Sequence, residues 1–233
     1  MDLYKAFYPA FKYGLHRKYD ISVENPENVL DMPAIYAPNH IKFADSALVA
    51  MVYTDITGLP LRFAAKQEYF DGDGIDNEGK LGRSMKFLME HSRMIPVNRE
   101  NVDFEALMAD TSRALRRGDS VALHPEGTRS EDGKIHRFRP GAAMIAIANS
   151  VPVVPTGLLY TEYSYGRKTH VDVMFGDALY PSEFASSRRT DRRQSLLFTE
   201  AIENSVARLT GMEQSRVPAK LKKLRDLGKT ERE

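Results

Sequence analysis

Short apolar runs alternate along this chain with longer segments in which apolar residues recur at the helical period. The short runs, typical of buried strands, cover residues 34–38, 61–66, 93–97, 120–124, 151–160 and 169–176. The segments with helical periodicity cover residues 3–15, 46–53, 84–91, 104–117, 142–149 and 192–209. This alternation predicts a single α/β domain, in which helices cover both faces of a sheet. Because 170–175 alternates as an edge or antiparallel strand does, we expect a mixed, mostly parallel sheet.

The first helix is predicted to be amphipathic. Tyr4, Phe7, Tyr8 and Phe11 recur at i, i+3, i+4 and i+7, with basic residues beside them. Such a helix packs on the domain or lies in a lipid interface, and the pattern alone leaves both open. We expect three parts: an amphipathic N-terminal helix over 1–20, the α/β domain over 21–212 and a basic C-terminal tail over 213–233.

The longest apolar run, residues 144–160, is interrupted by Pro152 and Pro155. It therefore predicts a buried helix, a turn and a buried strand rather than a membrane-spanning helix. The acidic loop over 71–80 lacks the oxygen, glycine and glutamate that a calcium-binding loop needs at its fifth, sixth and twelfth positions. We interpret it as a solvated loop.

Composition narrows the chemistry that the chain can perform. The 233 residues include no cysteine, which excludes disulfides, thiolate zinc sites and a cysteine nucleophile. A formal net charge of +1 is low for a nucleic-acid-binding protein, so we expect no nucleic-acid partner. Arginines at 188, 189, 192 and 193 and lysines and arginines of the tail form local basic clusters, which are sufficient for an anionic membrane surface.

A histidine and an aspartate stand five residues apart where one predicted helix begins. His40 and Asp45 would lie roughly 140° apart around a regular helix, so they would not face each other if both were helical. The spacing suits a histidine in the preceding loop, with its ring folded back over the first helical turn. A plainer alternative is that Asn39 and Asp45 only cap the helix.

The segment His124-Pro-Glu-Gly-Thr-Arg-Ser130 follows a predicted strand directly. Ligands of open α/β sheets gather at the carboxyl ends of strands. Gly127 allows close backbone approach, Arg129 offers a planar donor pair for a phosphate, and Glu126 can accept from a hydroxyl or brace an arginine. Arg137 and Arg139 either extend this positive surface or are ordinary solvated arginines.

In this order and at this separation, the two motifs resemble those of the glycerolipid acyltransferase family, which includes the 1-acylglycerol-3-phosphate acyltransferases. The resemblance covers most of residues 34–160 and consists of four blocks: NHIKFAD at 39–45, MIPVNR at 94–99, HPEGTRS at 124–130 and VPVVPTG at 151–157. It implies an α/β fold and transfer of an acyl group from a thioester to a hydroxyl.

Carried over by position, the resemblance makes His40 the general base and Asp45 its orienting carboxylate. It places the acceptor's phosphate and hydroxyl against Arg99, Glu126, Gly127 and Arg129. The family's fourth block is associated with packing or acyl binding, which suits the apolar residues 151–159.

The chain departs from the family pattern twice. Arg93 stands where the second block usually begins with glycine, and His124 stands where the third usually begins with an aromatic residue. His124 is either a second titratable group in the site or a residue that packs at a strand end, and we expect packing.

The chemistry itself requires such residues. An alcohol is a poor nucleophile at neutral pH, and a neutral imidazole can take its proton as the new bond forms. A carboxylate on the other ring nitrogen fixes the tautomer and stabilises the imidazolium. Because a thioester is already activated, we expect no metal, no cofactor and no covalent intermediate, although Ser46 and Thr128 are conceivable nucleophiles. The amides at the start of the helix after His40, or those of the Gly127 turn, could bind the oxyanion.

We therefore expect an O-acyltransferase of phospholipid biosynthesis, with 1-acylglycerol 3-phosphate or a related lysophospholipid as acceptor. Coenzyme A and acyl carrier protein are both open as donor carriers. Glycerol 3-phosphate, another hydroxyl acceptor, or a non-catalytic lipid-binding role are the alternatives. A cytoplasmic protein bound peripherally to an anionic membrane would reach such an acceptor.

Overall fold

The computed structural model describes residues 3–66, 94–97, 103–161, 168–189 and 191–217. Within this part of the chain, seven strands form one sheet in the order β1-β8-β7-β2-β5-β3-β4. Their bounds are β1 Tyr19–Glu24, β2 Ile35–Pro38, β3 Arg62–Lys66, β4 Ile95–Val97, β5 Val121–Ala122, β7 Val153–Thr161 and β8 Thr169–Phe175. Neighbours are parallel except β7 and β8, so the predicted mixed, mostly parallel sheet is confirmed.

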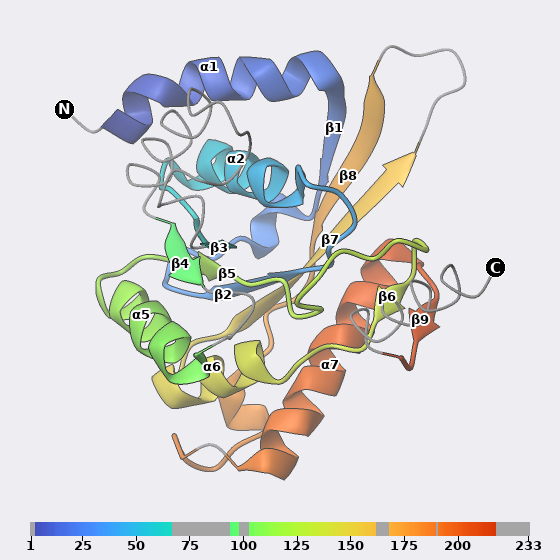
Figure 1. The fold of residues 1–233 in the computed structure, drawn as a ribbon. Coiled ribbons are helices and arrows are strands. Elements are labelled where there is room, and N and C mark those ends of the chain that lie inside the picture. Colours follow the sequence, from blue (N-terminus) through green and yellow to red (C-terminus); the bar gives the residue numbers. More distant parts are fainter. Residues whose placement is uncertain (1–2, 67–93, 98–102, 162–167, 190, 218–233) are drawn as a thin grey trace.

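Helices cover both faces of the sheet, as Figure 1 shows. On one face lie α1 (Leu3–Lys18) and α2 (Asp45–Thr57). On the other lie α5 (Phe104–Arg116), α6 (Gly141–Asn149) and α7 (Arg192–Thr210). Two single turns of 3₁₀ helix, Pro26–Asn28 and Pro181–Glu183, and a small parallel pair, β6 Ile135–His136 with β9 Gln214–Ser215, complete the described elements.

Strand β2 explains why the sheet is buried on both sides. Ile35 and Ala37 belong to the apolar core beneath α5, α6 and α7, whereas Ala34 and Tyr36 belong to the core beneath α1 and α2. All four are fully buried. A continuous apolar run is what a parallel strand covered on two faces requires.

The run over 144–160 divides as predicted into a buried helix, a turn and a buried strand. Helix α6 ends at Asn149, Ser150 takes a left-handed conformation (φ 52°), and β7 begins at Val153. In the described residues, no helix combines the length and apolarity that a membrane span needs.

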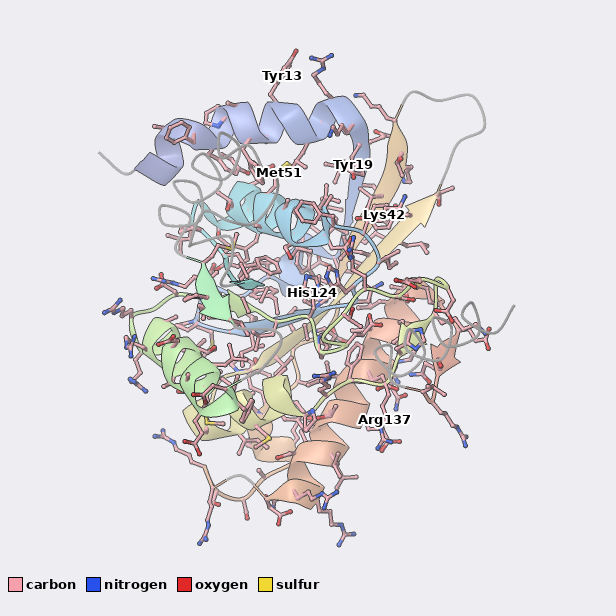
Figure 2. All side chains as sticks on the ribbon, viewed as in Figure 1. Tyr13, Tyr19, Lys42, Met51, His124 and Arg137 are labelled. Carbon is pink, nitrogen blue, oxygen red and sulfur yellow. The ribbon has the colours of Figure 1, made fainter. Side chains whose placement is uncertain are left out.

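Helix α1 packs on the domain through its inner residues. Tyr8, Phe11 and Leu15 contact the core around α2, and the Tyr8 hydroxyl donates to Asp55 Oδ1 over 2.8 Å. Phe7 is 49% exposed and Tyr13 67% exposed, and Tyr13 projects away from the molecule in Figure 2. The packing alternative therefore holds for the inner face of the helix.

Strand β1 was not predicted from the sequence, because residues 19–24 directly follow the helical pattern and are only partly buried. Its presence also corrects one expectation: β8 is antiparallel to β7, as predicted, but it lies between β7 and β1 and is not an edge strand. The predicted helix over 84–91, the loop over 71–80, Arg93, Arg99 and most of the predicted tail lie outside the described residues.

Candidate active site

The two sequence motifs meet because their strands are neighbours. Strands β2 and β5 are parallel, with Ile35 opposite Val121 and Tyr36 opposite Ala122. The loop with His40 follows β2, and the loop with His124 and Glu126 follows β5. The two loops therefore emerge at the same edge of the sheet, where open α/β folds bind ligands.

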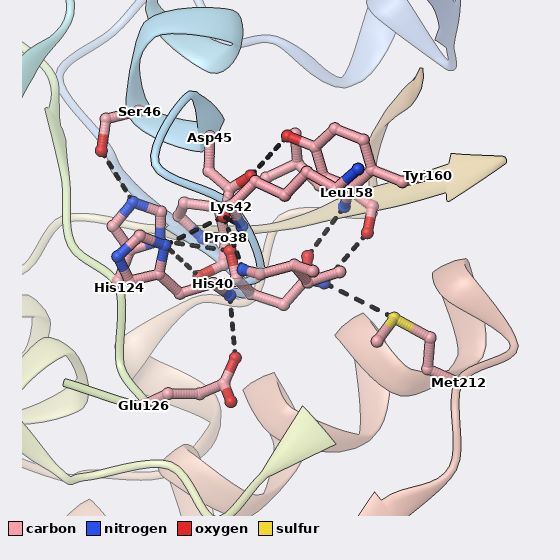
Figure 3. Close-up of polar contacts among 12 residues, drawn as sticks. Pro38, His40, Lys42, Asp45, Ser46, His124, Glu126, Leu158, Tyr160 and Met212 are labelled. Atoms are coloured by element: carbon pink, nitrogen blue, oxygen red, sulfur yellow. Dashed lines mark hydrogen bonds and ion pairs between the residues drawn. The ribbon is translucent and has the colours of Figure 1, made fainter. Parts of the chain in front are cut away.

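His40 and Asp45 form a buried hydrogen-bonded pair. His40 Nδ1 lies 2.9 Å from Asp45 Oδ2; Asp45 is fully buried and His40 is 7% exposed (Figure 3). His40 stands in the loop and Asp45 is the first residue of α2, so the imidazole folds back over the first turn as the spacing of five predicts.

Asp45 accepts hydrogen bonds from both sides. Oδ2 accepts from the backbone N–H groups of Ile41 (2.6 Å) and Lys42 (2.9 Å) as well as from His40. Oδ1 accepts from the Tyr160 hydroxyl over 2.5 Å. These donors belong to the preceding loop and to β7 rather than to the helix, so the plain capping alternative does not describe Asp45. The carboxylate is fixed in one orientation.

This arrangement defines the tautomer of His40. Because Asp45 Oδ2 accepts three hydrogen bonds as a carboxylate, Nδ1 of the ring carries the proton and Nε2 keeps its lone pair. No hydrogen bond to Nε2 is found within the described residues. A buried imidazole with a free Nε2 and a carboxylate on Nδ1 has the arrangement of a general base.

Asn39 is not a helix cap. Its side-chain amide donates to the Leu158 carbonyl (3.0 Å), its Oδ1 accepts from the Leu158 N–H (2.7 Å), and it is fully buried. The side chain thus continues the pairing of β2 with β7 beyond the end of β2. It fixes the backbone immediately before the histidine.

Glu126 holds the backbone of His40. Its Oε1 accepts from the His40 backbone N–H (2.8 Å) and its Oε2 from the His136 backbone N–H (3.1 Å), and only 2% of the residue is exposed. Contact with the acceptor, expected from the sequence, has little surface available; the contacts instead give Glu126 a bracing role between two loops. Burial raises the pKa of Glu126 from 4.5 to about 7, partly opposed by the two backbone hydrogen bonds.

Glu126 should make folding stability depend on pH. Because its folded pKa lies above its unfolded value, the folded state binds more protons between about pH 4.5 and 7, and stability falls as pH rises through that window. We expect the melting temperature of the wild type to decline from pH 5 to pH 8, and Glu126→Gln to flatten that decline at a lower overall stability. Thermal unfolding at several pH values measures this, with the exposed Glu27→Gln as control. A decline of equal steepness in Glu126→Gln would contradict the assignment.

Gly127 and the arginines lie on the exposed side of the second loop. Gly127 has φ 74°, and a Cβ atom there would approach Arg139 Nε to 3.1 Å, so only glycine fits without strain. Arg129 is exposed, and no ion pair or hydrogen bond to its side chain is found within the described residues. Arg137 instead lies beside α7 (Figure 2). Burial raises the pKa of Glu203 on that helix, and the charge of Arg137 partly opposes this rise.

His124 packs against the base, as expected, but it also makes hydrogen bonds. Its ring stacks on that of His40 with centroids 4.0 Å apart and an interplanar angle of 14°. Ser46 Oγ lies 2.9 Å from its Nε2. Burial, and secondly the neighbouring His40, lower the pKa of His124 from 6.5 to about 3.

Tyr160 is a site residue that the sequence motifs did not indicate. It stands 115 positions from Asp45 and lies beyond the fourth block, so no motif pointed to it. Lys42 Nζ lies 4.6 Å above its ring centroid. Burial, and then Asp45, raise its pKa, so it stays a neutral donor. Its position follows from the parallel register of β2 and β7, which pairs Pro38 with Thr156 and carries Tyr160 past the end of β2.

The fourth block and the residue after it contribute to the core. Val153, Val154 and Leu158 are fully buried and lie in the two apolar clusters. Over the described ranges, no group of three or more carboxylates and histidines is arranged to hold a metal ion.

The fold and the site together define an α/β protein with a buried histidine, hydrogen-bonded to a carboxylate, at the carboxyl ends of adjacent parallel strands. The family model named Acyltransferase matches residues 20–159, which is more than half of the chain. The chain therefore belongs to the acyltransferase family.

Several proteins of known name are similar to it. The chloroplastic 1-acyl-sn-glycerol-3-phosphate acyltransferase LPAT1 of Arabidopsis thaliana is 34% identical over 146 residues, 61% of this chain and 37% of the plant protein. The chloroplastic BAT2 enzyme of Brassica napus is 32% identical over 163 residues, 66% of this chain and 43% of its own length. The chain thus spans less than half the length of these two relatives.

A solved structure has the same fold. The crystal structure of the 1-acyl-sn-glycerophosphate acyltransferase PlsC from Thermotoga maritima superposes with a TM-score of 0.56 at 22% identity, and the match covers 88% of this chain and 78% of PlsC. This likeness confirms the predicted fold class.

Proposed function

We propose that the protein transfers a fatty acyl group from an acyl thioester to the hydroxyl of 1-acylglycerol 3-phosphate. The observation that carries the proposal is the His40–Asp45 pair, buried, 2.9 Å apart and with Nε2 of the ring unengaged in the described structure. The names of the plant relatives support the choice of acceptor.

The reaction follows from the geometry of the pair. Nε2 of His40 takes the proton of the acceptor hydroxyl while its oxygen bonds to the thioester carbonyl carbon. Asp45 stabilises the imidazolium that forms. The tetrahedral intermediate then expels the thiolate, and the imidazolium returns the proton to the departing sulfur. The ester and the free thiol are the products, and the protein is unchanged.

The oxyanion of the intermediate needs N–H donors that are not already used. The backbone N–H groups of Ile41 and Lys42 donate to Asp45, and that of Gly127 donates to the His124 carbonyl over 3.1 Å. At both predicted oxyanion sites, the segment after His40 and the Gly127 turn, these N–H groups are therefore already used. The remaining candidates to bind the oxyanion are N–H groups later in the first turn of α2 or in the loop after Gly127.

Arg129 is proposed to bind the phosphate of the acceptor. The next residue, Ser130, donates its backbone N–H to the His40 carbonyl over 2.7 Å, which keeps the backbone of Arg129 close to that of His40. Its exposed guanidinium can pair with a phosphate through two parallel hydrogen bonds. Arg99, which the family resemblance also assigns to this role, lies beyond the carboxyl end of β4 in sequence and outside the described residues.

Arg129→Ala should mainly weaken use of the acceptor. We expect the KM for 1-acylglycerol 3-phosphate to rise by about tenfold or more, with the donor KM changed less than about twofold, because only the phosphate contact is lost. The acceptor KM of Arg129→Lys should lie between those of the wild type and Arg129→Ala, since an ammonium cannot form two parallel hydrogen bonds to the phosphate. Arg113→Ala, which removes an exposed arginine from α5, is the control. An unchanged acceptor KM in Arg129→Ala would place the phosphate elsewhere.

The donor thioester is proposed to be carried on coenzyme A or acyl carrier protein, with no cofactor. The acceptor resides in a bilayer, so we also propose a peripheral position on an anionic membrane. The exposed Tyr13 on the outer face of α1 supports it, as does the basic end of that helix at His16, Arg17 and Lys18.

An acyl-transfer assay tests the function. Thiol release from acyl-CoA and acyl carrier protein would be followed with no acceptor, with 1-acylglycerol 3-phosphate, with glycerol 3-phosphate and with a larger-headgroup lysophospholipid, and products identified by mass spectrometry. We expect thiol release that depends on 1-acylglycerol 3-phosphate and yields phosphatidic acid. Release without any acceptor would indicate a thioesterase, and no release with either donor would contradict the proposal.

A further inference from the structure

We propose that His124 is a positioning residue for the base: its ring holds the imidazole of His40 in the plane that aims Nε2 at the acceptor. The catalytic consequence depends on the function proposed above, whereas the effect on the His40 ring does not.

One hydrogen bond does not fix the base. The contact between His40 Nδ1 and Asp45 Oδ2 sets the position of one ring edge but does not by itself define the plane of the ring. Since the lone pair of Nε2 lies in the ring plane, a rotation of that plane would turn it away from the acceptor. A second constraint on the plane is required.

The stack with His124 supplies that constraint. The rings of His40 and His124 lie 4.0 Å apart at 14°, which is close to face-to-face contact. On another side, His124 contacts the ring of Phe63 with centroids 5.7 Å apart, and Phe63 of β3 is buried in the core. The ring of His40 thus contacts His124, which in turn contacts Phe63 of the core.

Three polar contacts lock the plane of His124 itself. Its Nδ1 lies 3.2 Å from the carbonyl oxygens of both Pro38 and Asn39, which can only accept, so Nδ1 carries the proton (Figure 3). Its Nε2 then accepts from Ser46 Oγ over 2.9 Å. Because these partners precede and follow His40 in the chain, His124 ties both ends of the loop that carries the base.

The same contacts keep His124 uncharged. Both of its nitrogens are matched in the neutral form, and protonation of Nε2 would leave Ser46 Oγ without its acceptor. The imidazolium that forms on His40 during the reaction therefore meets a neutral ring and not a second cation. Asp45 of α2 and Glu126 and His124 of the loop after β5 contact His40. Tyr160 of β7 bonds the far side of Asp45, and Lys42 of the His40 loop lies over the Tyr160 ring.

His124 makes two kinds of contact. A phenylalanine ring could replace its stacking on His40, but not the hydrogen bonds of its two nitrogens. His124→Phe keeps the stack and removes the hydrogen bonds, whereas His124→Ala removes both. The stacked pair Phe184 and Phe198, with centroids 4.5 Å apart and remote from the base, offers a matched control in Phe184→Ala.

The experiment measures kcat, both KM values and the pH dependence of kcat/KM for the wild type and these three variants. It also follows the titration of the His40 ring by NMR on protein labelled with ¹⁵N in histidine. For His124→Ala we expect kcat to fall by about 30-fold with both KM values within about twofold, because the base is misdirected while the substrates still bind.

In His124→Ala, water also gains access to the face of His40 and hydrates its charged form. The acidic limb of the kcat/KM profile and the NMR titration midpoint should therefore both move to higher pH. His124→Phe should keep kcat within about fivefold of the wild type and the midpoint in place. Phe184→Ala should lower only the melting temperature.

Two results would overturn the proposal: a His124→Ala protein that loses only thermal stability, or a His124→Phe protein as slow as His124→Ala with the same displaced midpoint. If the wild type itself transfers no acyl group, the proposed function fails. The NMR comparison of the alanine and phenylalanine variants then still decides whether His124 controls the His40 ring.

Discussion

His40→Ala is expected to lower kcat for acyl transfer to 1-acylglycerol 3-phosphate by about 10³- to 10⁴-fold, the range that a general base contributes. The variant removes the only nitrogen that can take the hydroxyl proton in the proposed mechanism, since Nε2 of His124 already accepts from Ser46. Acceptor and donor KM should change little, because the proposed phosphate site does not involve the imidazole. Initial rates at saturating substrate measure the loss.

His16→Ala provides the matched control for this experiment, because His16 is exposed at the end of α1 and has no assigned role. It should keep the rate of the wild type. If His40→Ala retained a tenth or more of the wild-type kcat with an unchanged melting temperature, the base would have to be another group, and the proposed mechanism would be wrong.

Asp45→Asn is expected to lower kcat by about 10²- to 10⁴-fold through the tautomer of His40. An asparagine can offer its NH₂ group to Nδ1, which then accepts and moves the ring proton to Nε2, where no lone pair remains for the acceptor. The substitution keeps the volume of the side chain, but Ile41 and Lys42 donate to the same Oδ2 as His40, so an NH₂ group there also removes the acceptor of their N–H groups. The melting temperature should therefore fall as well, and kcat is compared at a temperature at which both proteins are folded.

Asp55→Asn makes the same chemical change on the same helix, at a carboxylate that contacts Tyr8 and Lys12 of α1. It should leave kcat unchanged and lower the melting temperature slightly. ¹⁵N chemical shifts of His40 report the tautomer directly in both proteins. A His40 ring that kept its proton on Nδ1 in Asp45→Asn, together with near-normal turnover, would contradict the assigned role of the carboxylate.

The pairing of His40 with Asp45 could be predicted because it is local. Five residues separate the two, and the start of α2 between them leaves one arrangement in which the side chains meet. That each of the two motifs follows a buried strand was also predicted. What the strand pattern could not provide was the order of the strands, which places β2 directly beside β5.

Partners that are distant in sequence were beyond prediction. Tyr160 reaches Asp45, and Asn39 bonds Leu158, only because β7 pairs with β2 in one particular register. Glu126 illustrates the same limit: its residue type suggested contact with an acceptor, but the approach of two loops turned both oxygens toward backbone N–H groups. A motif specifies which groups are present, while the sheet decides what each one touches.

The sequence by itself determined the main alternation of helices and strands, apart from β1, because periodicity is a property of the chain. Its motifs also indicated the acyltransferase family, and their local spacing indicated the pairing of His40 with Asp45. Only the tertiary structure decided how the base is held. The stack of His124 on His40 and the bond from Tyr160 to Asp45 join residues 84 and 115 positions apart. Contacts over such separations depend on strand order and register, which arise from packing the whole sheet and not from any one segment.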